Sequence, residues 1–191
     1  MKKNHGYTLI EMIIVIAIIV ILSGMSFVTI GIIKQAKCNS AATTLSNQIG
    51  SLLVKTRALS EAKKSATDPK KSPLCMKIQY NDSDVTFADG TYAKAGSYSL
   101  ILGYDNGTTF VEKTADTVEA TLPDIITINY TSTDKKSCSI TGLDTSTNMI
   151  IEFNKSNGSV RYGAGTYEIV YNNNVVATVY LDADTGNHYV K

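Results

Sequence analysis

The sequence predicts an α+β fold, in which one long N-terminal helix precedes a domain of antiparallel β-strands. An uninterrupted apolar segment from Met12 to Ile33 is followed by apolar residues at helical spacing up to Leu59. After Pro73 the pattern changes to short runs of β-forming residues that are separated by turn residues. A helix with one apolar side and a sheet with one apolar face can bury each other, so we expect the helix to pack on the sheet.

The apolar segment from Met12 to Ile33 carries no charged residue. As a helix it is about 33 Å long at ~1.5 Å per residue, which is enough to span the ~30 Å hydrocarbon core of a bilayer. Lys2 and Lys3 precede it, and the next basic residue is Lys34. Because basic residues stay on the cytoplasmic side of a membrane, we expect a cytoplasmic N-terminus, one membrane span, and the rest of the chain outside.

Glu11 is an acidic residue at the edge of this apolar segment. A carboxylate at the centre of a membrane helix costs about 2.5–3.5 kcal/mol, and less towards the end. No basic side chain lies within the next two helical turns. Cleavage between Gly6 and Tyr7 would place a new amine about one turn before Glu11, where it could neutralise the carboxylate of its own chain or of a neighbour.

The N-terminal residues resemble the start of type IV pilins and of the pseudopilins of type II secretion. The resemblance rests on the basic residues before Gly6, an aromatic residue at Tyr7, then Thr8-Leu9-Ile10, Glu11 and a long apolar helix. It implies removal of residues 1–6 as a leader by a prepilin peptidase, N-methylation of Tyr7, and a role for Glu11 in assembly. Most members have Phe in place of Tyr7.

An ordinary signal-anchor helix with a chance glutamate is the alternative interpretation of this segment. A secretory signal peptide fits less well, because the apolar segment is long and no small-x-small cleavage site follows it. We therefore expect a leader at residues 1–6, a transmembrane or filament-core helix at residues 7–33, and an extracytoplasmic, pilin-like α+β domain at residues 34–191.

Beyond Lys34 the helix is expected to continue as an amphipathic one. Small and apolar residues recur at steps of three and four on one side; they are Cys38, Ala42, Leu45, Ile49, Leu52, Thr56 and Leu59. The helix should run from Thr8 to about Lys64, because Asp68-Pro69 and Ser72-Pro73 would interrupt it.

The second part of the chain alternates between strand and turn signals. Asn-Gly and Asp-Gly pairs favour tight hairpins, because both central residues need a positive φ. We expect one antiparallel sheet built from ten strands: Leu74–Tyr80, Val85–Phe87, Tyr98–Tyr104, Phe110–Lys113, Ile125–Tyr130, Met149–Phe153, Ser159–Tyr162, Tyr167–Tyr171, Val175–Leu181 and His188–Val190.

The three cysteines cannot all pair within one chain. An exported domain meets an oxidising environment, which favours one disulfide. A disulfide between Cys75 and Cys138 is our first choice, since we expect both residues in sheet segments. Cys38 falls on the apolar side of the helix and is expected to be a buried small residue. Three buried thiols are the alternative.

The sequence contains no catalytic or metal-binding pattern that we recognise. There are two histidines and no Cys-x-x-Cys pair, no Gly-rich phosphate loop with Lys, and no Gly-x-Ser-x-Gly. We therefore expect no enzyme activity, no metal and no cofactor.

Charge is divided unevenly along the chain. The segment from Lys34 to Lys77 has nine basic and two acidic residues, so its net charge is 9 − 2 = +7. The segment from Ile78 to Lys191 has seven basic and fourteen acidic residues, so its net charge is 7 − 14 = −7. Opposite charges could attract neighbouring copies when they stack. The alternative is that both are solvated surfaces.

The C-terminal part contains a strand ending in Phe, a glycine turn and a closing hairpin: Met149–Phe153, Asn157-Gly158, Gly165–Ile169, Val179–Leu181 and Asp184–Gly186. These features resemble the end of H-type pseudopilins and related minor pilins. Some of these relatives bind DNA through an Arg-rich C-terminus. Residues 182–191 hold two aspartates and a single lysine here, so we do not expect nucleic-acid binding.

These features together predict a structural subunit, a minor pilin or pseudopilin of a type IV pilus, type II secretion or competence machine. Its partners would be other pilin subunits, the prepilin peptidase and the membrane. It would lie in the cytoplasmic (inner) membrane before assembly and then in an extracellular or cell-surface filament. A DNA-binding minor pilin for DNA uptake and a membrane-anchored ligand-binding domain are the alternatives.

Overall fold

The computed structural model describes residues 8–59, 72–113, 118–133 and 148–191, without the side chains of residues 25–30. It divides into two compact units, 1–36 and 37–191. Helix α1 (Leu9–Ala58) contributes residues to both units. The expected extension of this helix to Lys64 is wrong at Leu59, which is not helical, and otherwise lies outside the described residues.

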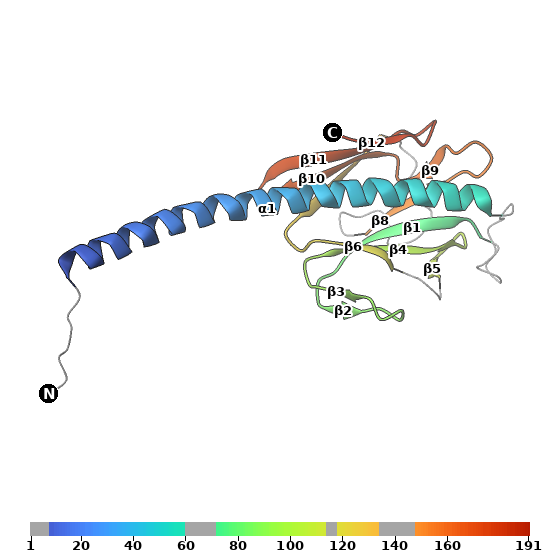
Figure 1. Cartoon of the computed structure of the whole chain (residues 1–191). Coiled ribbons are helices and arrows are strands. Elements are labelled where there is room, and N and C mark those ends of the chain that lie inside the picture. The colour runs from blue at the N-terminus through green and yellow to red at the C-terminus, as the bar shows by residue number, and fades with distance from the viewer. Residues whose placement is uncertain (1–7, 60–71, 114–117, 134–147) are drawn as a thin grey trace. The chain divides into compact units, whose positions relative to one another are not determined.

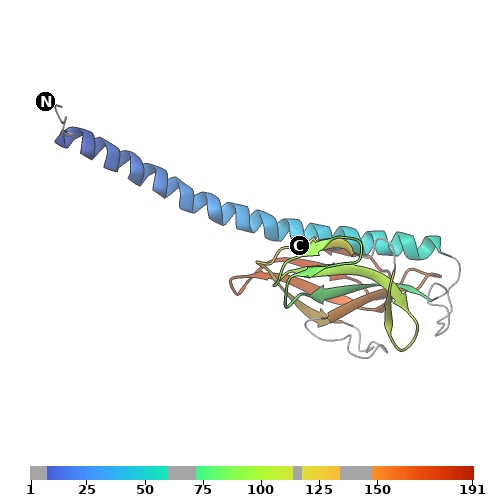
Figure 2. The ribbon, with the colours of Figure 1, turned by 90° about the horizontal axis from the view of Figure 1, so that it is seen from below.

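The amphipathic half of α1 buries the apolar side that its spacing predicts. Six positions are at most 5% exposed: Cys38, Ala42, Leu45, Ile49, Leu52 and Thr56. Leu59 is 40% exposed, so its predicted burial is wrong, because the helix has ended one residue earlier. Figure 1 shows this half of α1 running alongside the strands of the second unit, and the view in Figure 2 agrees.

The described strands form antiparallel sheets, which confirms the α+β class. Their bounds are β1 (Leu74–Tyr80), β2 (Val85–Thr86), β3 (Tyr92–Ala93), β4 (Tyr98–Asp105), β5 (Phe110–Glu112), β6 (Val118–Leu122), β7 (Thr127–Ser132), β8 (Asn148–Phe153), β9 (Val160–Tyr162), β10 (Gly165–Tyr171), β11 (Asn174–Leu181) and β12 (His188–Val190).

The single sheet expected from the sequence is wrong. One sheet has the order β5-β4-β1-β8-β9, with β6 also paired to β4, and a second has the order β12-β11-β10-β7. Strands β2 and β3 form a separate hairpin. Strand β7 precedes β8 in the chain but pairs with β10, so the described strands pass between the two larger sheets three times, before β7, before β8 and before β10. Periodicity shows which residues are extended but not which strands become neighbours.

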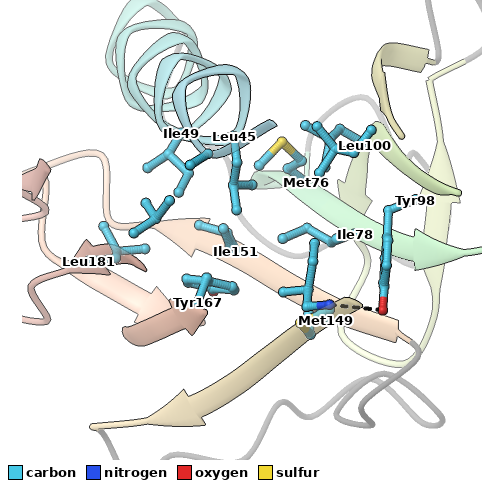
Figure 3. Close-up of a cluster of buried hydrophobic side chains, with 14 of the residues drawn as sticks. Leu45, Ile49, Met76, Ile78, Tyr98, Leu100, Met149, Ile151, Tyr167 and Leu181 are labelled. Carbon is cyan, nitrogen blue, oxygen red and sulfur yellow. Dashed lines mark hydrogen bonds between the residues drawn. The ribbon is translucent and has the colours of Figure 1, made fainter. Parts of the chain in front are cut away.

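One core joins the helix to both larger sheets. Side chains of α1, of β1, β4 and β8, and of β10 and β11 belong to one buried cluster. Figure 3 shows members from each of these elements facing one another: Leu45, Ile49, Met76, Ile78, Leu100, Met149, Ile151, Tyr167 and Leu181. The buried side chains of α1 therefore pack in one core with side chains from both larger sheets.

A polar contact also ties the two sheets together. The backbone N–H of Ile128 on β7 donates to the Tyr98 hydroxyl on β4 at 3.2 Å (Figure 3). Tyr98 is 3% exposed, and this burial raises the pKa of its phenol. A buried N–H without a partner would be costly. The hydroxyl therefore satisfies an amide at the edge of the second sheet.

Some of the uneven charge is compensated inside the chain. Lys55 on α1 pairs with Glu119 on β6 at 2.7 Å, and Lys77 on β1 lies 3.8 Å from Glu112. Both pairs join the basic segment to the acidic one. Burial lowers the pKa of Lys77, and Glu112 opposes that effect. These charges are therefore partly neutralised within one molecule, so fewer unpaired charges remain to attract another copy.

We predict that Leu45→Ala destabilises the second unit by about 2–5 kcal/mol, because it removes a fully buried side chain and leaves a cavity. The matched control is Val54→Ala on the same helix, where the side chain is 68% exposed and the change should stay within about 0.5 kcal/mol. Urea unfolding of the solubilised chain measures both. Equal effects at the two positions would contradict the core described here.

Candidate functional site

The candidate site lies at the N-terminal end of α1. Of its three sequence-predicted residues, Gly6 and Tyr7 lie outside the described residues, and Glu11 lies within them. The expected cleavage and methylation at Gly6 and Tyr7 therefore stay predictions. The structure places the third residue, Glu11, in the first turn of α1.

Thr8 and Glu11 form a reciprocal cap at the start of α1. The Thr8 backbone N–H and the Thr8 hydroxyl both donate to Glu11 Oε2, each at 2.8 Å. In return, the Glu11 backbone N–H donates to Thr8 Oγ1 at 3.4 Å. This is the capping-box arrangement, in which Ser or Thr at the cap and Glu three residues later satisfy each other's free amides.

Thr8 was not predicted as a partner of Glu11, because only a positive charge was considered as a partner and the apolar segment contains none. The signal was present as Thr8-Leu9-Ile10-Glu11, which matches the capping-box pattern. A carboxylate in the first turn also interacts favourably with the helix dipole. Glu11 is thus stabilised within a single chain by Thr8.

The two oxygens of the Glu11 carboxylate differ in their contacts. Both donors from Thr8 reach Oε2. Among the described residues, no donor contacts Oε1. A carboxylate can accept about four hydrogen bonds in all. The cap therefore holds the carboxylate at the start of the helix and leaves one oxygen able to accept an ammonium.

Around and beyond Glu11 the helix presents apolar side chains on every side. Large apolar residues from Leu9 to Leu22 are 47–79% exposed in the single chain. Within the described part of the chain, we find no helix that combines the length and the apolar content needed to cross a membrane. The span expected at residues 7–33 is therefore not confirmed.

Two of the three cysteines can be placed. Cys38 is fully buried in the core, as expected, and burial raises the pKa of its thiol. Cys75 is buried on β1, with its sulfur 3.7 Å from the Gly103 carbonyl oxygen. Cys138 lies outside the described residues, so a disulfide between Cys75 and Cys138 stays a prediction.

The acidic turn after β11 is structured by its own backbone. The Asp182 carboxylate accepts hydrogen bonds from the Thr185 N–H at 2.9 Å and from the Thr185 hydroxyl at 2.6 Å. These bonds lower the pKa of Asp182. Across the residues that the structure describes, no three His, Cys, Asp or Glu side chains gather in a way that could hold a metal ion.

The comparisons with known proteins address the N-terminal segment. Residues 1–27 match the family model of the prokaryotic N-terminal methylation motif. No curated protein and no solved structure matches the chain. The matched residues include the cap between Thr8 and Glu11. The chain therefore carries the prepilin-type motif of type IV pilins and pseudopilins, which points to a structural subunit of that kind.

Proposed function

We propose that this protein is a minor pilin or pseudopilin that is cleaved after Gly6, methylated at Tyr7, and assembled into a filament through the N-terminal half of α1. The observation that carries the proposal is the methylation motif at residues 1–27. The machine would be a type IV pilus, a type II secretion system or a competence pseudopilus. The likeness of the C-terminal strands to H-type pseudopilins supports a minor component.

Processing would create the charge that assembly needs. Hydrolysis of the Gly6–Tyr7 bond leaves a carboxylate on Gly6 and an amine on Tyr7. At neutral pH a terminal amine is largely protonated. The mature chain then starts with a cation directly before Thr8, whose backbone N–H and hydroxyl hold Glu11.

Glu11 would receive the Tyr7 ammonium of a neighbouring subunit on its open oxygen. The Thr8 bonds occupy Oε2 and orient the carboxylate, so the ion pair forms without breaking the cap. In an apolar environment opposite charges attract far more strongly than in water. An unpaired carboxylate in the same place would be expensive. The pair would therefore favour a fixed register between adjacent helices.

The apolar half of α1 would supply most of the assembly energy. A helix that is apolar on all sides belongs in a membrane or in the core of an assembly. Its large side chains from Leu9 to Leu22 are about half or more exposed in one chain. Before assembly this half would lie in the cytoplasmic membrane, and afterwards neighbouring helices would replace lipid around it.

Residues 34–191 would form the extracytoplasmic domain. The buried side of α1 fixes this domain to the helix through a shared core. A subunit that enters the filament by its helix therefore carries the sheets with it. This arrangement is what a pilin-like subunit needs in order to present a folded domain on a filament surface.

The isolated mature protein should begin at Tyr7 and carry one N-methyl group. N-terminal mass analysis of protein from cells with a prepilin peptidase measures this directly. Gly6→Leu should leave the leader in place, because a bulky residue then stands at the cut, whereas Gly6→Ala should still be processed. Native protein that starts at Met1 would rule out the proposed processing.

Glu11→Gln should abolish filament incorporation while leaving cleavage and membrane association intact. Gln keeps a side-chain oxygen for the Thr8 donors but removes the charge that pairs with the ammonium. Thr8→Ala is the matched control, because it removes the two hydrogen bonds of the Thr8 hydroxyl at a cost of about 1 kcal/mol, while it keeps the backbone N–H bond and the Glu11 charge.

Fractionation of sheared filaments and membranes, followed by immunoblotting, separates the outcomes of this experiment. The proposal predicts filament-associated Thr8→Ala and membrane-retained Glu11→Gln. Normal incorporation of Glu11→Gln would show that assembly does not require the negative charge of Glu11, and this result would contradict the proposal.

A further inference from the structure

A hollow of about 440 Å³ opens on the surface of the second unit. Its walls are the first turns of this unit's helix, the segment after β3, and the turn after β6. Ligand pockets in proteins usually measure about 300–1,000 Å³. Neither the N-terminal motif nor the proposed assembly uses this hollow.

The helical wall consists of residues on one side of α1. Lys37, Ser40, Ala41 and Thr44 are spaced by three, one and three positions, so their side chains lie on the same face. Ala41 is buried and belongs to the core, whereas Lys37 and Ser40 are exposed. The floor of the hollow therefore meets the core, and its rim carries polar groups.

The opposite wall holds an ion pair. The Lys94 ammonium donates to the Asp124 carboxylate, which raises the pKa of Lys94 and lowers that of Asp124. Both groups are therefore charged at neutral pH. Lys37 acts on Asp124 only at longer range, and within the described ranges no carboxylate lies at ion-pair distance from Lys37. The charged side chains that line the hollow sum to one net positive charge, and Asp84 adds a negative charge near Lys94 from outside the lining.

Hydroxyl groups that can still form hydrogen bonds line the same hollow as Lys37. Ser40, Thr44 and Thr121 line the hollow. Among the residues that the structure describes, none of these three hydroxyls has a hydrogen-bond partner. Each can donate one hydrogen bond and accept up to two. A ligand rich in hydroxyl groups could use all of them.

Tyr92 and Pro123 add apolar surface to the polar rim. Tyr92 is 56% exposed, and its hydroxyl donates to Asp84 at 2.6 Å, which holds the ring in place. Leu122, which is 2% exposed, lies beside Pro123. An aromatic ring that is anchored through its hydroxyl offers a preorganised surface for the C–H face of a ring-shaped ligand.

We propose that this hollow binds a saccharide that carries one carboxylate, such as a hexuronic acid. The carboxylate would pair with Lys37, the ring hydroxyls would bond to Ser40, Thr44 and Thr121, and the apolar ring face would pack on Tyr92. A single negative charge matches Lys37, the lining cation that has no carboxylate at ion-pair distance among the described residues. A doubly charged phosphate fits less well, because Asp124 already neutralises Lys94 and would repel the second charge.

Isothermal titration calorimetry of the solubilised full chain with D-glucuronate tests this proposal. The detergent must be zwitterionic and free of sugar headgroups, which could occupy the hollow. Saturable binding of glucuronate is expected. D-Glucose and acetate should each bind at least about tenfold more weakly, because D-glucose lacks the carboxylate and acetate lacks the sugar ring with its hydroxyl groups. Because the measurement uses unassembled protein, its result does not depend on the proposed function.

Two variants and one control locate the binding. Lys37→Gln should weaken glucuronate binding about tenfold by removing the charged partner. Ser40→Tyr, at an exposed position, should block the hollow without changing its charge. Lys155→Gln is the control, since Lys155 lies in the β8–β9 connection and does not line the hollow. It should bind as the unchanged chain does.

Three results would overturn the proposal. They are the absence of glucuronate binding, equal binding of glucuronate and acetate, and equal loss of binding in Lys37→Gln and Lys155→Gln. If glucuronate does not bind but Lys37→Gln and Ser40→Tyr impair filament incorporation, the hollow receives part of another subunit and the saccharide assignment is wrong.

Discussion

One helix has to satisfy two environments, and the rest of the molecule follows from this constraint. From Lys37 onward, α1 buries one line of side chains against two sheets. From Leu9 to Leu22 it has no polar face, and its large apolar side chains stay 47–79% exposed in the single chain. The first property makes a stable domain, because the buried side chains form one core with strands of both sheets. The second makes a segment that needs lipid or neighbouring helices around it.

The cap between Thr8 and Glu11 shows how an acidic residue can be kept beside such a segment. Two hydrogen bonds from Thr8 hold one oxygen of the Glu11 carboxylate within the single chain. A charge held in this way loses little freedom when the partner arrives, and preorganisation of this kind strengthens an interaction without adding contacts. In the proposed assembly, Thr8 therefore positions the carboxylate and the neighbouring amine supplies the charge.

Much of this architecture could be predicted from local patterns, and the parts that could not depend on distant pairing. The three- and four-residue spacing from Cys38 to Thr56 predicted the buried side of α1, and alternation predicted Leu74–Tyr80 as a strand with the observed bounds. Strand β6 was missed although Val-Glu-Ala-Thr-Leu alternates apolar and polar residues, because Glu and Ala are depleted in strands. Strand β3 was missed because it has two residues. The second sheet was missed because no local pattern shows that β7 pairs with β10. At the candidate site Glu11 was identified, but its partner Thr8 was not, because the search considered charge and neglected capping.

The central claim is that Glu11 of one subunit pairs with the amine of Tyr7 of another. Solid-state NMR on filaments grown from a mixture of two subunit preparations tests this contact most directly. One preparation carries ¹⁵N at the Tyr7 amine and the other carries ¹³C at the Glu11 carboxyl carbon. The account predicts dipolar coupling between the two labels, at a separation of about 4 Å. Intact mixed filaments without coupling between the labelled amine and the labelled carboxylate would contradict it.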